Sequence, residues 1–326
     1  MIKKKEDKSI THHMVQYGVW PNCVNECKFC LRAERTYYTK DKQIDILRTI
    51  RKNIDIVDWK DKFSAGISLL GGELYFITDK DLQKEFMLLI DDIIKKVLKV
   101  SPNPYVKYST VTNGMYNPKF LYKVIDKIRK EVGIDKVDVN FSYDIKYRYP
   151  NEKMRKLALK NINAFHKRYN YKVNVQMILT QYLIDMWKNG EFDYNEFIKE
   201  NIPGNHLTFL YPHPIRTEYP LKDFFFKRND FLSFIRYLKE ANTEGYLSFI
   251  FSTFNSARFK YTGLRDRNED KIADNPNLKP VLSDGKEIVN KKCNHSTLYQ
   301  CYSDSDKCML CDIINLIDEE GYLKDY

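Results

Sequence analysis

Three cysteines near the N-terminus have the spacing of a metal-binding loop. Cys23, Cys27 and Cys30 form a C-x3-C-x2-C pattern, and three thiolates this close together can hold one face of a metal cluster. Four cysteines would saturate a four-iron cluster, whereas three leave one iron free to bind another ligand. Chance would produce this spacing on the order of 0.003 times in a chain with so few cysteines. The pattern therefore indicates a reactive metal centre, and the alternative is a zinc site completed by His12 or His13.

A second group of cysteines lies near the C-terminus in a C-x7-C-x6-C-x2-C pattern. Its members are Cys293, Cys301, Cys308 and Cys311. Four thiolates can complete either a tetrahedral zinc site or a fully ligated iron–sulfur cluster, and the spacing accepts both. His295 is an alternative ligand, although we expect it to be a bystander. The odd total of seven cysteines, in a chain whose N-terminus lacks a secretion signal, argues against a disulfide framework.

The elements that must position the first group alternate between strands and helices. Short apolar runs predict six strands, over His13–Val19, Ala65–Leu70, Val106–Val111, Lys136–Tyr143, Val173–Leu179 and His206–Tyr211. Apolar residues at helical spacing predict helices over Asp41–Val57, Lys80–Val100, Pro118–Val132, Glu152–Tyr169, Tyr194–Glu200 and Asp223–Ala241. Six strand–helix repeats imply parallel strands with right-handed crossovers. The fold class is therefore α/β, a partial (β/α)6 barrel, followed by a further apolar, strand-like segment over Tyr246–Phe254.

Polar and glycine residues follow three of the predicted strands, at the edge where parallel barrels place their active sites. Gly71-Gly72-Glu73 ends the second strand, where glycines allow close backbone approach to a ligand and a carboxylate suits an ammonium group. Thr112-Asn113-Gly114 ends the third strand, and Ser142 and Asp144 end the fourth. Ordinary turn chemistry is the alternative explanation for these residues.

These features together resemble the radical S-adenosylmethionine (radical SAM) superfamily. The resemblance rests on the cysteine loop after a first strand, with the aromatic Phe29 just before the last cysteine, and on the Gly-Gly-Glu and Thr-Asn-Gly segments. It implies a 4Fe-4S cluster held by the three cysteines, with S-adenosylmethionine bound to the fourth iron. An electron from the cluster would cleave the sulfonium, giving methionine and a 5′-deoxyadenosyl radical that abstracts a substrate hydrogen.

The same resemblance implies which residues bind the cofactor. They are Phe29, Gly71, Gly72, Glu73, Asn113, Ser142 and Asp144. Glu73 and its glycines correspond to the segment that contacts the methionyl amine, and Ser142 and Asp144 stand where the family places ribose-binding groups. No residue is assigned a catalytic role of its own.

The C-terminal cysteines resemble the SPASM or shorter twitch extensions of that superfamily, which hold auxiliary clusters. Ser283-Asp284-Gly285-Lys286 resembles the hairpin turn that opens such an extension. Four cysteines support one auxiliary 4Fe-4S cluster at most, with zinc as the alternative. We therefore expect two domains, a radical SAM partial barrel over residues 1–245 and a cysteine-rich extension over residues 246–326.

Composition and charge say less about the binding partners of the protein than the cysteine motifs say about its chemistry. The chain has 326 residues and a formal charge of +10, which a lysine-rich solvated surface explains as well as an anionic partner does. No apolar run reaches the roughly 20 residues of a membrane span, so we expect a cytoplasmic protein without membrane contact. The resemblance implies a reductant such as flavodoxin or ferredoxin and favours a peptide or protein substrate. A nucleotide or nucleic acid substrate, or a non-catalytic zinc-stabilised binding protein, are the alternatives.

Overall fold

We describe the protein from a computed structural model. The structure describes residues 14–23, 27, 37–55, 59, 66–101, 103–149, 151–210, 227–242, 245, 246 and 249. Cys30, Phe29 and the four C-terminal cysteines lie outside these residues, as does the segment predicted to form the hairpin. The two-domain boundary at residue 245 therefore stays a prediction.

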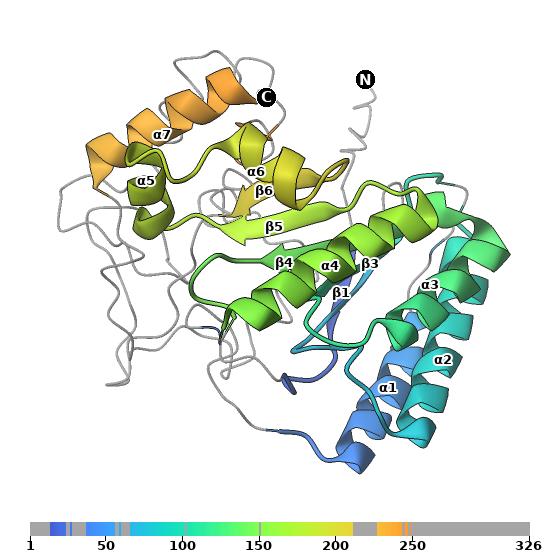
Figure 1. Ribbon diagram of the computed structural model, residues 1–326. Coiled ribbons are helices and arrows are strands. Elements are labelled where there is room, and N and C mark those ends of the chain that lie inside the picture. The colour runs from blue at the N-terminus through green and yellow to red at the C-terminus, as the bar shows by residue number, and fades with distance from the viewer. Residues whose placement is uncertain are drawn as a thin grey trace, which may run out of the picture. The chain divides into compact units, whose positions relative to one another are not determined.

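The predicted α/β architecture is confirmed for the described residues. Six parallel strands form one sheet in the order β1-β2-β3-β4-β5-β6, each separated from the next by helix (Figure 1). The strands are β1 (Met14–Gly18), β2 (Gly66–Leu70), β3 (Tyr108–Thr112), β4 (Val137–Tyr143), β5 (Asn174–Ile178) and β6 (His206–Leu210). Sequential order with parallel pairing is the arrangement of a partial (β/α)6 barrel, so the C-terminal strand ends share one edge.

The chain divides into two compact units. The first is drawn from Met1–Glu26, Glu34–Tyr143 and Arg148–Val175 and contains β1–β4. The second is drawn from Cys27–Ala33, Asp144–Tyr147 and Gln176–Tyr326 and contains β6.

Helices α1–α4 lie in the described part of the first unit, and α1, α2 and α4 begin at side-chain caps. Their bounds are α1 (Lys40–Ile54), α2 (Lys80–Ile93), α3 (Lys119–Val132) and α4 (Glu152–Tyr169). The side chains of Thr39, Asp79 and Asn151 each accept a backbone N–H of the first turn of α1, α2 and α4 respectively, which satisfies donors that a helix start leaves open. Helix α1 lies beside α2, and α3 lies along the other side of α2 (Figure 1).

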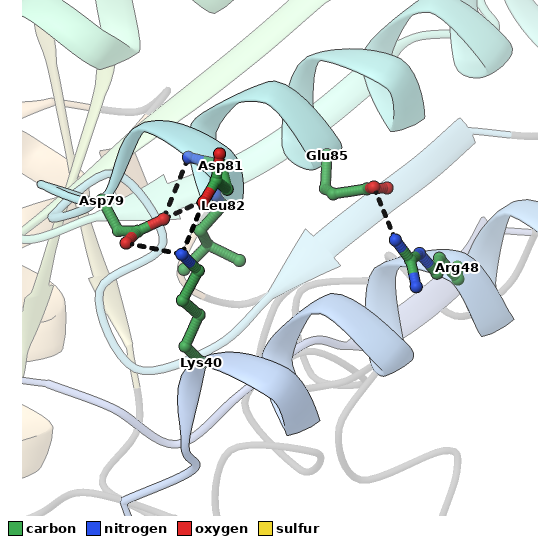
Figure 2. Close-up of polar contacts among 6 residues, drawn as sticks. All are labelled: Lys40, Arg48, Asp79, Asp81, Leu82 and Glu85. Carbon is green, nitrogen blue, oxygen red and sulfur yellow. Dashed lines mark hydrogen bonds and ion pairs between the residues drawn. The ribbon is translucent and has the colours of Figure 1, made fainter.

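The first two helices are also joined by ion pairs (Figure 2). Lys40 Nζ lies 2.9 Å from Asp79 Oδ2 and 2.7 Å from Asp81 Oδ2, which ties the start of α1 to the start of α2. One to two turns further on, Arg48 Nη2 lies 2.9 Å from Glu85 Oε1. Apart from Glu85, which is half-buried, the side chains of these pairs are largely exposed, so we expect them to set the register between the helices more than to stabilise them.

The described residues of the second unit include helices α5, α6 and α7 and show two departures from the sequence prediction. Helices α6 (Tyr194–Asn201) and α7 (Arg228–Ala241) were predicted, but α5 (Gln181–Lys188) was not. Tyr246, which was predicted to lie in a strand, is helical and donates its N–H to Asn242 O. Tyr246 and Phe249 are both buried, and their spacing of three is helical, so the apolar run was wrongly interpreted there.

A further difference concerns the end of the second predicted helix. The α-helix α2 ends at Ile93, and Ile94–Leu98 continues it as a π-helical turn in which Lys99 N donates to Ile94 O at 3.0 Å. Periodicity alone does not distinguish the two, because apolar residues on one face stay buried through the wider turn.

Aromatic packing fixes the segment that leads into the cysteine loop. The ring of Phe86 on α2 contacts the rings of Trp20, Tyr75 and Phe120 edge-on, with centroids 6.1, 6.1 and 5.6 Å away. All four side chains are buried. Trp20 follows β1 and precedes Cys23 by three residues, so this cluster anchors the approach to the cysteines on the helical layer.

Candidate functional site

The segment after β1 stays paired with the segment after β2. Val19 N donates to Leu70 O at 2.7 Å, Gly72 N to Trp20 O at 2.7 Å, and Glu73 N to Asn22 O at 2.8 Å. The two backbone segments therefore run side by side beyond the C-terminal ends of β1 and β2. Cys23 follows directly, so its position is set by main-chain hydrogen bonds at the C-terminal edge of the sheet.

The two glycines of Gly71-Gly72-Glu73 make this approach possible. A Cβ on Gly72 would lie 2.1 Å from Asn22 O, and one on Gly71 would lie 2.2 Å from Leu74 Cδ2 and 2.9 Å from Trp20 O. The close approach that these glycines allow is to the protein's own chain, and the predicted approach to a ligand stays a prediction. The chain that approaches Gly72 is the N-terminal arm of the cysteine loop.

The carboxylate of Glu73 is turned into the protein and is only 2% exposed. Its Oε1 lies 2.9 Å from Thr112 Oγ1, and its Oε2 accepts the N–H of Asn113 at 2.8 Å. The backbone N–H of Tyr75 also points at Oε1, at 3.5 Å. The Gly-Gly-Glu and Thr-Asn-Gly segments, predicted separately, are therefore joined through this side chain.

Burial raises the pKa of Glu73 to about 7, against the opposing effect of its hydrogen bonds from Asn113 and Thr112 and of the charge on Arg148. Removing a carboxylate from water disfavours its ionised form more than these donors favour it. The same burial raises the pKa of Tyr116, whose hydroxyl lies 2.9 Å from Thr112 Oγ1. Glu73 thus belongs to a buried hydroxyl network whose charge changes near neutral pH.

The amide of Asn113 is oriented by its neighbours. Its Oδ1 accepts the N–H of Met115 at 2.9 Å, which leaves its Nδ2 facing Cys23 Sγ at 3.9 Å. The two residues are 90 positions apart in the sequence. An N–H directed at a thiolate favours the charged sulfur that binds a metal.

The fourth strand contributes to the same edge through a tyrosine. The hydroxyl of Tyr149 lies 3.3 Å from Asn113 O and 3.1 Å from Ser142 O, so it connects the ends of β3 and β4. Ser142 is half-buried there. In the second unit, Asp144 is buried and its Oδ1 accepts the backbone N–H groups of Lys146 and Tyr147, as the turn interpretation of Asp144 predicts.

The two described cysteines, each taken in its own unit, have the chemistry of ligands for thiophilic metals. Cys23 is half-buried and faces an amide N–H, and Cys27 is buried with 6% of its surface exposed. Thiolates hold iron–sulfur clusters and zinc alike. Within the part of the chain that the structure describes, no three His, Cys, Asp or Glu side chains form a metal-binding group, and Cys30 lies outside that part.

Sequence reasoning missed the residues that hold this edge together. Asn22 pairs with Tyr38, Tyr149 connects two strand ends, and Asn161 on α4 donates to Gly114 O at 2.6 Å and Tyr116 O at 2.9 Å. None of these residues lies in a recognisable motif. Only the position of Asn22, next to a cysteine, could have pointed to it.

Comparison with family models gives no match, and comparison with curated proteins gives none either. Among solved structures, the chain is similar to native anSMEcpe with bound AdoMet, at 15% identity and a TM-score of 0.46, over 72% of this chain and 61% of that one. A structure of native anSMEcpe with bound AdoMet and Cp18Cys peptide has 15% identity and a TM-score of 0.48, over 72% of this chain and 60% of that one. The matches thus span less than two thirds of those chains. The likeness concerns the fold alone.

No helix among the described residues has the length and apolar character that crossing a membrane requires.

Proposed function

We propose that the protein is a radical SAM enzyme, which binds a 4Fe-4S cluster through Cys23, Cys27 and Cys30 and cleaves S-adenosylmethionine there. The observation that carries the proposal is the position of Cys23 beside Asn113, with Nδ2 and Sγ 3.9 Å apart at the ends of β1 and β3. The C-terminal ends of parallel strands are where such barrels act. When bound, the cluster would supply the electron that converts S-adenosylmethionine to methionine and a 5′-deoxyadenosyl radical.

The residues around Cys23 have structural tasks in this proposal. Gly72 and Asn22 hold the backbone that precedes Cys23, and Glu73 and Asn113 join the second and third strand ends. Both carboxylate oxygens of Glu73 already accept hydrogen bonds from the protein. We therefore propose that the methionyl amine is bound by polar groups exposed at this edge, with Glu73 fixing the backbone that presents them.

Metal analysis tests the class of protein. Anaerobically purified protein should contain about four irons with sulfide for one cluster, or about eight for two. Reduced protein with S-adenosylmethionine should release 5′-deoxyadenosine, and Cys27→Ala should abolish that release. A matched control is Asn195→Ala, whose side chain makes an exposed hydrogen bond to Ala241 O in the second unit. Zinc without iron, or turnover that survives in Cys27→Ala, would contradict the proposal.

We further propose that Cys293, Cys301, Cys308 and Cys311 hold one auxiliary 4Fe-4S cluster and that the substrate is a peptide or protein. The support is the resemblance of the C-terminal cysteine pattern to SPASM and twitch extensions. Replacing Cys308 and Cys311 together by Ala should halve the iron content while 5′-deoxyadenosine release persists. If the same variant loses zinc and keeps its iron, the C-terminal site is a zinc site instead.

A further inference from the structure

The side chain of Asn22 pairs with the main chain of a residue beyond the cysteines. Its Nδ2 donates to Tyr38 O at 3.0 Å, and its Oδ1 accepts the N–H of Tyr38 at 2.9 Å. The two hydrogen bonds assign the orientation of the amide, because only one orientation places a donor against the carbonyl and an acceptor against the N–H. Asn22 therefore binds one residue at two points.

Both partners of this pair are attached to rigid elements. Tyr38 O also accepts from Nε2 of Gln43, a buried residue in the first turns of α1, at 2.9 Å. On the other side, Asn22 O accepts the N–H of Glu73 at 2.8 Å. A third contact lies next to the pair, where the Tyr37 hydroxyl donates to Cys23 O at 2.9 Å. The pair thus connects helix α1 to the edge of the sheet.

In the sequence, Asn22 precedes and Tyr38 follows all three cysteines of the first group. We propose that Asn22 is a positioning residue of the metal centre, which holds together the two ends of the cysteine segment before metal binds. The inference rests on the proposed function for the identity of the metal, but the contacts that carry it do not depend on any metal. Holding the ends together removes entropy that metal binding would otherwise have to overcome.

The chemistry of Asn22 makes the inference specific. Alanine at this position loses both hydrogen bonds. Aspartate keeps the acceptor for Tyr38 N–H but places a carboxylate oxygen against Tyr38 O, where two acceptors repel. Two part-buried hydrogen bonds correspond to a change of about tenfold in the population of the joined state. We expect Asn22→Ala and Asn22→Asp to differ little from each other and strongly from wild type.

The test measures iron release from the reconstituted full-length protein to a ferrous chelator under anaerobic conditions. Asn22→Ala and Asn22→Asp should release iron about tenfold faster than wild type, while the melting temperature of the metal-free chain stays within a few degrees. Asn195→Ala, which removes one exposed side-chain hydrogen bond far along the sequence, should behave as wild type. Release within twofold of wild type in both Asn22 variants would overturn the inference.

A second measurement separates this inference from the proposed function. In the metal-free chain, hydrogen exchange of the Tyr38 amide, whose N–H donates to Asn22 Oδ1, should be about tenfold faster in Asn22→Ala than in wild type. If wild type binds no iron but this difference is present, the proposed function fails and the positioning role of Asn22 stands. If wild type binds iron and exchange is unchanged, the proposed function stands and the role of Asn22 fails.

Discussion

The buried carboxylate of Glu73 leads to a prediction about stability and pH. Its pKa is raised from its ordinary value of 4.5 to about 7 because burial disfavours the ionised form. The folded state therefore binds this proton more tightly than the unfolded chain does. Where the native state carries the extra proton, the free energy of unfolding falls as pH rises. Stability from this group is fully present below about pH 4.5 and is lost as pH rises through about 7.

The interval between the two pKa values sets the magnitude. A rise from 4.5 to about 7 corresponds to about 3 kcal/mol of unfolding free energy, of which about 2.5 kcal/mol falls between pH 5 and pH 8. Glu73 is fully buried, so solvent does not screen this effect. For a chain of this size, whose net stability is on the order of 10 kcal/mol, such a loss is easily measured.

The hydrogen bonds of Glu73 allow either protonation state. Thr112 Oγ1 lies 2.9 Å from both Glu73 Oε1 and the Tyr116 hydroxyl oxygen. A hydroxyl group donates one proton and can accept another hydrogen bond. Ionised Glu73 accepts from Thr112, which then accepts from Tyr116, whereas protonated Glu73 donates to Thr112, which donates to Tyr116. Because the row of hydroxyls reverses without losing a bond, protonation proceeds without rearrangement of the fold.

The assay is urea unfolding of the full-length, metal-free chain at pH 5 and pH 8. Wild type should lose about 2.5 kcal/mol more than Glu73→Gln between the two values, because the glutamine does not titrate. The comparison cancels other titrating groups. The control is Glu131→Gln, since Lys99 lowers the pKa of that exposed carboxyl and its removal should leave the loss intact. Equal pH dependence in wild type and Glu73→Gln would refute the reasoning.

Three more perturbations follow from the geometry of the same edge. Gly72→Ala should abolish metal binding and lower the melting temperature, because its Cβ would lie 2.1 Å from Asn22 O. The control Gly190→Ala, where there is open space but a φ of +73°, should lower the free energy of unfolding by only about 1 kcal/mol and keep the metal. Metal retention in Gly72→Ala would contradict the steric argument. If the proposed cluster is bound, Asn113→Ala should move its reduction potential to more negative values, because an N–H directed at Cys23 Sγ would stabilise the reduced, more negative cluster. A potential equal to that of the exposed-site control Asn195→Ala would show that the 3.9 Å contact is inert. Phe86→Ala should lower the free energy of unfolding in urea by about 3–5 kcal/mol. Arg48→Ala, which breaks one ion pair between α1 and α2, should change that free energy by less than about 1 kcal/mol. Similar losses in the two variants would be inconsistent with a core that depends on the Phe86 ring.

The fold could be predicted because its strands and helices differ in period. Short apolar runs such as Gly66–Leu70 alternate along the chain with amphipathic helices such as α2 and α4. This alternation indicates parallel strands connected by crossover helices. Helix α5 was missed because it is short, with eight residues from Gln181 to Lys188, and because only Leu179 and Thr180 separate it from the end of β5. Tyr246 was misassigned because a buried aromatic run has no visible period over so few residues.

The site could be predicted only where chemistry fixes the residue type. The assignment of Cys23 and Cys27 as metal ligands from their spacing stays a prediction, whereas parallel topology correctly placed Gly72, Glu73 and Asn113 at one edge. The direction in which a side chain points is not in the pattern. Glu73 turns inward because Asn113 N–H and Thr112 offer partners there, and that depends on the register between β2 and β3.

The strand ends of the first unit form one connected set of hydrogen bonds. Asn22 O accepts from Glu73 N, Glu73 Oε2 accepts from Asn113 N, and Asn113 O and Ser142 O both lie within reach of the Tyr149 hydroxyl. Groups in one network do not contribute independently, because removing one leaves its partners unsatisfied. The position of Cys23 therefore depends on Glu73, whose charge changes near neutral pH, as well as on its own loop. The proposed metal centre would then be sensitive to the packing of β2 against β3, a property that the three cysteines alone do not explain.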